Sequence, residues 1–134
     1  MSERKLRILM AKFGEGSEQS MFRLSRSFSE AGYEVIYTST QNPRAIAISA
    51  LQESADHIGI TTLPGATLEH FQELITEMQQ QGVAHIPLSA GGIFPEKDLD
   101  ALQKMGIVKF FKEGTTYQEL LTWSRAHIKP IDPS

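Results

Sequence analysis

Apolar runs and amphipathic stretches alternate five times along this chain. The runs have the length of β-strands and predict strands at Leu6–Phe13, Glu34–Ser39, His57–Thr62, Ala84–Ser89 and Val108–Phe111. Between them, apolar residues recur every three to four positions, which predicts amphipathic helices. Regular alternation of strands and helices predicts a parallel sheet with right-handed crossovers and helices on both faces.

Glycine and proline mark the expected helix ends. Gly32, Gly82 and Gly106 each follow a helical stripe, where a left-handed residue commonly ends a helix. Asn42-Pro43 is typical of a helix start. Five strands of this length predict an α/β fold of flavodoxin-like type, a doubly wound sheet in the order 2-1-3-4-5 with helices on both faces. We expect one domain over residues 1–134, with its core at about 6–128 and a frayed tail at 129–134.

Composition narrows the class of protein. The chain has 134 residues, 40% of them hydrophobic and 22% charged, as in an ordinary globular domain. A net charge of −3 argues against a nucleic-acid partner, and the absence of cysteine excludes disulfides and thiol chemistry. No run approaches the roughly 18 apolar residues of a membrane span, and the first apolar run is too short for a signal sequence. We therefore expect a cytoplasmic domain without a membrane partner.

The loops that follow the predicted strands are rich in small and hydroxyl residues. They cover Gly14–Ser20, Thr61–Gly65, Ser89–Gly92 and Lys112–Thr116, and few of their side chains titrate. Small residues let an extended ligand approach the backbone, and hydroxyls supply hydrogen bonds. The loops favour holding a cofactor over acid–base catalysis, so we predict no catalytic residue and no metal ligand. Tight turns alone would also need glycine, and that interpretation stays open.

Two functions common on this architecture do not fit the loops. A response-regulator receiver needs a phosphoacceptor Asp at the end of strand 3, where this chain has Thr61-Thr62. A flavodoxin needs a Ser/Thr-rich phosphate loop after strand 1, where Glu15 and Glu18 would place two carboxylates against the anion.

Four segments occur in a fixed order that is similar to a known family. They are Arg7–Gly14 with Ala31–Tyr37, Ile58–Leu63, Ser89–Pro95 and Glu113–Thr115. Together they resemble the cobalamin-binding domain of adenosylcobalamin-dependent acyl-CoA mutases, the methylmalonyl-CoA mutase type. The resemblance extends from about Leu6 to Ile128 with consistent spacing.

The resemblance implies that a corrin ring lies at the carboxyl edge of the sheet, with its nucleotide tail buried beside strand 1. It implies a hydroxyl contact from Thr61 and close backbone approach at Gly91 and Gly92. The full set of implied cofactor-binding residues is Gly16, Ser17, Glu18, Thr61, Leu63, Gly65, Gly91, Gly92, Phe111, Gly114 and Thr115.

The family's D-x-H-x-x-G signature is changed in this chain. Its His ligates cobalt and its Asp orients that imidazole. Alignment backward from Ala31-Gly32 puts Glu15 at the Asp, Ser17 at the His and Ser20 at the Gly. A serine hydroxyl is a poor cobalt ligand.

Histidines elsewhere do not replace the missing ligand. No histidine precedes position 57. We expect His57 at the amino end of strand 3, far from the crevice, His70 exposed on the third helix, His85 in strand 4 and His127 in the last helix. Each is expected to be a surface or structural residue.

Three functions stay open. In the first, the chain is the cobalamin-binding small subunit or domain of an adenosylcobalamin-dependent acyl-CoA mutase, an isomerase, without the usual His ligand and with the cofactor base-on. A large barrel subunit would then be its partner, and the chain alone would be inactive. In the second, it is a non-catalytic paralogue that has lost cobalamin and serves as an assembly or regulatory module. In the third, the crevice binds another small ligand. The acyl-CoA substrate and a homo-oligomeric state stay open.

Overall fold

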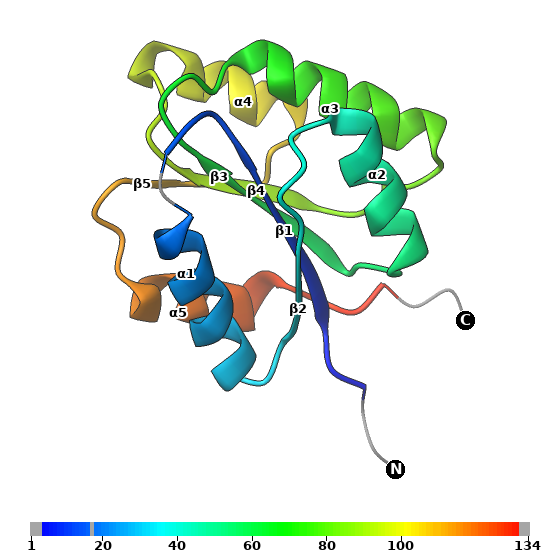
Figure 1. Cartoon of the computed structure of the whole chain (residues 1–134), viewed down its shortest axis with the longest axis vertical. Coiled ribbons are helices and arrows are strands. Elements are labelled where there is room, and N and C mark those ends of the chain that lie inside the picture. Colours follow the sequence, from blue (N-terminus) through cyan, green and yellow to red (C-terminus); the bar gives the residue numbers. More distant parts are fainter. Residues whose placement is uncertain (1–3, 17, 132–134) are drawn as a thin grey trace.

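The computed structural model describes residues 4–16 and 18–131, which form one five-stranded parallel sheet between two layers of helices. The sheet order is β2-β1-β3-β4-β5, which confirms the predicted fold class and strand order. Helices α1 and α5 cover one face, and α2, α3 and α4 cover the other (Figure 1). The strands are β1 (Arg7–Phe13), β2 (Glu34–Tyr37), β3 (His57–Thr62), β4 (Leu88–Gly92) and β5 (Lys109–Lys112). The helices are α1 (Gln19–Glu30), α2 (Pro43–Gln52), α3 (Leu68–Gln80), the short 3-10 turn η1 (Glu96–Asp98), α4 (Leu99–Met105) and α5 (Tyr117–His127).

Most predicted element ends agree with the structure. Asn42 caps α2 by accepting the N–H of Ala45, and Pro43 is the first helical residue. The glycines that were expected to end helices all have left-handed φ, at Gly32, Gly82 and Gly106. In the part of the chain that the structure describes, no helix is long and apolar enough to cross a membrane.

The fourth strand differs from the prediction. The pattern predicts it at Ala84–Ser89, and it lies at Leu88–Gly92. Val83 and Ile86 are buried without being in a strand, because the Val83 N–H bonds back to the Met78 carbonyl and closes the end of α3. The buried residues of the turn that ends α3 therefore give the same apolar sequence pattern as a strand. Residues 91 and 92, predicted in a loop, belong to the sheet, and His85 lies in an exposed turn.

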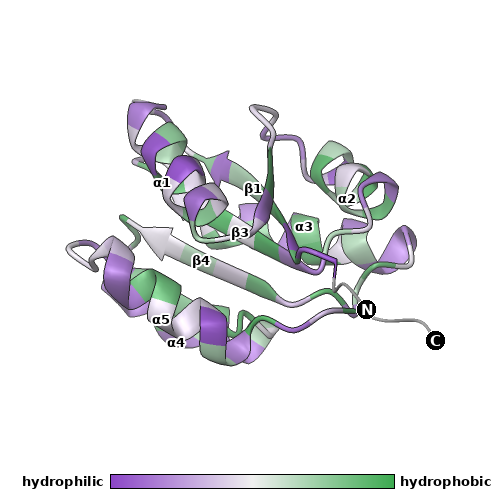
Figure 2. Cartoon of the chain, turned by 90° about the horizontal axis from the view of Figure 1, so that it is seen from below, coloured by the Kyte–Doolittle hydropathy of each residue, from purple (hydrophilic) through white to green (hydrophobic). Residues whose placement is uncertain are grey.

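The two faces of the sheet are packed differently. Side chains such as Leu9, Ile58 and Ile60 point toward α2, α3 and α4 and belong to a large continuous core. The other face carries a much smaller buried cluster, built around Ile8 and Phe28. Strands β3 and β4 are visible between α1 and α5 when this face is viewed (Figure 2). Less apolar surface is therefore buried on the α1 and α5 side.

Asp56, just before β3, joins both ends of the described chain at the amino edge of the sheet. Its carboxylate accepts two hydrogen bonds of 2.7 Å from the Arg4 guanidinium and one of 2.8 Å each from the N–H groups of Arg7 and Ile131. Burial raises the pKa of Asp56, but these hydrogen bonds outweigh it and hold the pKa below its usual value. The bonded Ile131 lies within the tail expected to fray from residue 129, whereas residues 132–134 lie outside the described part.

Asp56→Asn is expected to lower the free energy of unfolding at pH 7 by about 1–3 kcal/mol, because the buried carboxylate accepts four hydrogen bonds and an amide cannot replace all of them. Since the folded pKa is depressed, this stabilisation is present above the unfolded pKa of about 4 and is lost as the pH falls through the folded pKa. Urea unfolding should show that wild type is more stable than the variant at pH 7. The difference in the free energy of unfolding should become smaller in acid. The control is Glu34→Gln, whose carboxylate meets Arg7 at the surface and contributes less than about 1 kcal/mol. Equal effects of the two substitutions at pH 7 would contradict this role of Asp56.

Candidate functional site

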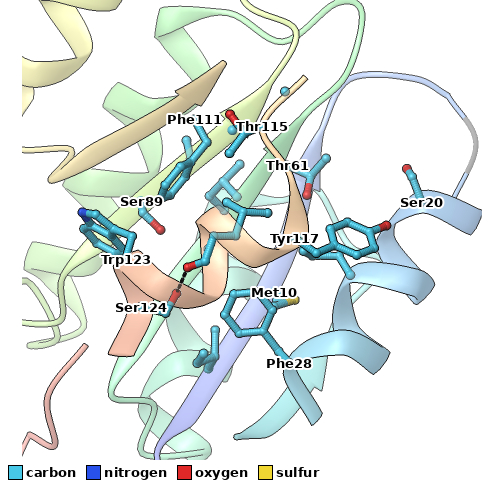
Figure 3. Close-up of a pocket in the computed structure, with 18 of the residues that line it drawn as sticks. Met10, Ser20, Phe28, Thr61, Ser89, Phe111, Thr115, Tyr117, Trp123 and Ser124 are labelled. Carbon is cyan, nitrogen blue, oxygen red and sulfur yellow. Dashed lines mark hydrogen bonds between the residues drawn. The ribbon is translucent and has the colours of Figure 1, made fainter. Parts of the chain in front are cut away.

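A cavity of about 270 Å³ lies between the sheet and helices α1 and α5 (Figure 3). It extends from the carboxyl ends of the strands, at Thr61 and Gly92, toward their amino ends, at His57 and Ser89. Sites for small molecules measure about 300–1,000 Å³, so the cavity suits one small ligand or one end of a larger ligand. Its walls come from four strands and two helices and include Met10, Ser20, Phe28, Gly59, Phe111, Tyr117, Trp123 and Ser124.

Gly59 in β3 leaves the middle of this face open. A Cβ built at Gly59 would have no heavy atom within 4 Å, and its φ lies outside the left-handed region. Alternation along the strand places Gly59 on the same face as His57 and Thr61, which both line the cavity. Glycine inside a strand is less stable than alanine by about 0.5–1 kcal/mol. Neither backbone geometry nor packing therefore explains this glycine, and a ligand in the cavity would.

Two of the predicted ligand-approach glycines have structural reasons of their own. A Cβ at Gly91 would lie 3.0 Å from both the Cβ and the carbonyl oxygen of Phe111. At Gly92 φ is +125°, and a Cβ would collide with the Thr62 carbonyl. Both residues line the cavity, but the packing of the sheet requires glycine there with or without a ligand.

The remaining predicted site residues divide into two groups. Thr61, Phe111, Gly114 and Thr115 line the cavity together with the two β4 glycines. Of the other described residues, Gly16, Glu18, Leu63 and Gly65 do not line it, and Ser17 lies outside the described part of the chain. Leu63 and Gly65 pack against the backbone of Gly14, and Leu63 also lies beside Gly16. Leu63, Gly65 and Gly16 therefore build the contact between the loops after β1 and β3.

Hydrogen bonds hold the start of the loop after β1 against its neighbours. The Gln41 amide accepts the Gly14 N–H at 2.8 Å and donates to the Gly14 carbonyl at 3.0 Å. The Glu15 N–H donates to the Pro64 carbonyl at 2.9 Å. This part of the loop is thus fixed by two other loops of the same sheet edge.

Glu18, predicted to bind cofactor, lies in a polar cluster at the start of α1. It accepts a 2.7 Å hydrogen bond from the Tyr37 hydroxyl and pairs with the buried Lys12 ammonium at 3.1 Å. Hydrogen bonds from Tyr37 and then Lys12 lower the pKa of Glu18. Burial, followed by the hydrogen bond to Glu18, raises the pKa of Tyr37 to about 12. The Glu18 charge is therefore balanced within the protein.

His57 begins β3 at its amino end, as predicted, but it also lines the inner end of the cavity, which the sequence analysis did not expect. Its Nε2 is 2.8 Å from the Ser89 hydroxyl, and its ring meets the Trp123 ring edge-on at 6.0 Å. Within the described chain, Nδ1 has no hydrogen-bond partner. Burial lowers the pKa of His57 to about 4, so the ring is neutral at pH 7. The alternation His57, Gly59, Thr61 was the sequence signal that places all three on the cavity face.

His70 and His127 make packing contacts with aromatic rings. His70, predicted to be exposed, is half-buried and stacks on Phe13 at 4.9 Å, on the face away from the cavity. Its Nδ1 accepts the Thr67 N–H at 3.0 Å, so this nitrogen is already used within the protein. His127 stacks on Trp123 at 4.6 Å. Over residues 4–16 and 18–131, no group of three or more His, Cys, Asp or Glu side chains could hold a metal ion.

Sequence comparison identifies relatives across most of the chain. The family model of the B12 binding domain matches residues 7–121. The chain is 28% identical over 123 residues to the 2-hydroxyisobutanoyl-CoA mutase small subunit of Aquincola tertiaricarbonis, covering 90% of each chain. It is 30% identical to the methylmalonyl-CoA mutase large subunit of Propionibacterium freudenreichii subsp. shermanii and 31% identical to the human mitochondrial methylmalonyl-CoA mutase. These matches cover 87% and 84% of this chain but only 16% and 15% of those proteins.

Structure comparison shows the same fold in response regulators. A chemotaxis response regulator of Vibrio cholerae has a TM-score of 0.69 and 17% identity, covering 92% of this chain and 98% of that chain. A response regulator from Desulfuromonas acetoxidans has a TM-score of 0.70 and 18% identity, covering 95% and 99%. At this identity the likeness shows the fold alone. The end of β3 is Thr61-Thr62, without the phosphoacceptor Asp of a receiver.

The contrast between the two strand glycines predicts opposite effects of alanine. Gly59→Ala is expected to leave the free energy of unfolding unchanged or to raise it by up to about 1 kcal/mol, because the methyl group enters open space. Gly91→Ala is expected to lower it by about 1–3 kcal/mol, because the methyl group meets Phe111. Denaturant titration of both variants measures the difference. If Gly59→Ala lowers the free energy of unfolding as much as Gly91→Ala does, the space beside Gly59 is not open.

Proposed function

Because the chain belongs to the B12-binding domain family, we propose that it carries cobalamin as the small subunit or domain of an adenosylcobalamin-dependent acyl-CoA mutase. The nucleotide tail of the cofactor lies in the cavity between the sheet and helices α1 and α5, and the corrin ring lies at the carboxyl edge. The observation that carries this proposal is the open space at Gly59, for which the protein itself gives no reason.

The lining of the cavity fits a nucleotide tail. Phe111 and Trp123 offer aromatic surface to a planar base, and their rings already meet edge-on at 5.4 Å. Thr61, Thr115 and Ser20 bring hydroxyls to the part nearest the carboxyl edge, where the sugar and phosphate of the tail would pass (Figure 3). When bound, adenosylcobalamin supplies a cobalt–carbon bond that breaks to give a radical. The residues of this chain would bind and orient the cofactor.

We further propose that no imidazole of this chain ligates cobalt. The alignment places Ser17 where the family has its ligand, and no histidine precedes His57. One base cannot lie in the cavity and coordinate cobalt at the same time. The cavity favours burial of the tail, so we propose that the cofactor would be bound in the base-off form.

The partner proposed for this chain is a large barrel subunit that holds the acyl-CoA, and the chain alone is inactive. A relative of similar length that is itself a small mutase subunit supports this assignment. A second candidate is a non-catalytic paralogue, which the changed signature at Glu15, Ser17 and Ser20 favours. The open cavity argues against that candidate, because a protein that has lost its cofactor gains nothing from an unfilled space.

Titration with hydroxocobalamin tests the proposed cofactor. Wild type is expected to retain corrin after desalting, with a base-off visible spectrum. Gly59→Val is expected to fold but to bind at least about tenfold more weakly, because its side chain fills the space meant for the tail. Thr76→Val, on the exposed side of α3, is the control and should bind like wild type. No retained corrin would refute cobalamin binding, and a base-on spectrum would refute burial of the tail.

Ser17→His is expected to restore a cobalt ligand. In electron paramagnetic resonance of the Co(II) form, wild type should show no splitting from a coordinated nitrogen, and Ser17→His should show it. Isotopic labelling of the protein nitrogen should change that splitting, which identifies the imidazole as its source. Ser17→Ala serves as the control and should match wild type. A wild-type spectrum in Ser17→His would contradict the alignment of Ser17 with the family's ligand.

A further inference from the structure

The inner end of the cavity, farthest from the carboxyl edge, carries a buried polar pair. His57 in β3 and Ser89 in β4 are 2% and 8% exposed, and their Nε2 and Oγ atoms lie 2.8 Å apart. Trp123 and Ser124 of α5 line the same end, and Figure 3 shows Ser89 and Trp123 on one side of it. The Ser124 hydroxyl is already used, because it donates to the Leu120 carbonyl at 2.8 Å.

The pair keeps unused hydrogen-bonding capacity in either of its arrangements. A neutral imidazole has one donor and one acceptor nitrogen, and a serine hydroxyl has one donor and two acceptor lone pairs. If His57 donates to Ser89, the Ser89 hydroxyl hydrogen remains free. If Ser89 donates to His57, the hydrogen of Nδ1 remains free, and no described residue accepts it. A buried polar group without a partner is unfavourable by about 1–3 kcal/mol. A ligand with a polar group that hydrogen-bonds to the pair would remove this penalty and so bind more tightly.

The rest of the inner end is apolar. Ile8 and Met10 of β1, beside β3 in the sheet, and Phe28 of α1 line it, and all three are at most 5% exposed. A flat ring could therefore pack its faces against apolar side chains while one edge meets the pair formed by His57 and Ser89. The polar pair and the apolar lining together fit an aromatic heterocycle that has a polar group on its outer edge.

We propose that His57 and Ser89 select the lower base of the bound cobamide and favour a base with a hydrogen-bonding outer edge. This inference rests on the proposed function, in which the tail enters from the carboxyl edge and its terminal base reaches the inner end. The outer edge of dimethylbenzimidazole carries two methyl groups, which cannot bond to the pair. Adenine and hydroxybenzimidazole carry an amino or hydroxyl group there. The pair thus discriminates between cobamides that share one corrin ring.

Titration with three cobamides tests this selection: cobalamin, the adenine cobamide and the hydroxybenzimidazole cobamide. Wild type is expected to bind the two cobamides with polar-edged bases about tenfold or more tightly than cobalamin. Hydroxybenzimidazole keeps the imidazole ring that binds cobalt, so its comparison with cobalamin isolates the outer edge of the base. Dissociation constants from visible spectra are the readout, and no enzymatic activity is needed.

Two variants separate the pair from the rest of the cavity. The double substitution His57→Val with Ser89→Val removes both polar groups together and is expected to abolish or reverse the preference. Thr76→Val is the control, because Thr76 is exposed on α3, on the other face of the sheet, and the preference should stay. If the double variant does not fold, Ser89→Ala, which should reduce the preference, replaces it.

The outcomes distinguish this inference from the proposed function. Equal binding of all three cobamides by wild type, or a preference for cobalamin, overturns the role of the pair and leaves cobalamin binding in place. A preference for polar-edged bases that survives the double substitution also overturns it. Failure to bind any cobamide refutes the proposed function and the inference together.

Discussion

The unequal packing of the two sheet faces is the constraint on which the rest of this structure depends. Toward α2, α3 and α4 the strands carry large apolar residues, and their burial supplies most of the core. The other face buries a much smaller apolar cluster and is partly uncovered. There Gly59 has no side chain, and nothing else fills its place. A stable fold with a hollow is possible because one face provides the stability and the other provides the space.

Polar contacts at the two edges of the sheet serve different purposes. At the amino edge, Asp56 joins residues near both ends of the described chain through four hydrogen bonds. At the carboxyl edge, Gln41 and Pro64 fix the start of the loop after β1, and Lys12 neutralises Glu18. The edge at which a cofactor would bind is therefore organised by contacts between loops, and the charge of Glu18 at this edge is balanced within the protein. Such an edge suits holding a ligand better than proton transfer.

The sequence pattern predicts the fold well where local and tertiary signals agree. β3 has the predicted limits because its apolar run is bounded by a polar helix end and a turn. β4 does not, because Val83 and Ile86 are buried by the closing turn of α3 and carry the same apolar signal as a strand. Similarly, the resemblance finds Thr61, Phe111, Gly114 and Thr115, which do line the cavity. It also selects Leu63 and Gly65, whose contacts are with another loop.

The sequence by itself determined the order of the elements, the parallel sheet and the absence of a histidine from the loop after β1, since each depends on residues close together in the chain. Only the tertiary structure decided which residues form the site. His57 and Ser89 lie 32 positions apart and become partners because β3 and β4 are neighbours in the sheet. Gly59 and Gly91 look alike in sequence, but one faces open space and the other faces Phe111. The meaning of a glycine in a strand depends on what the next strand and the covering helices place above it, and no local pattern contains that information.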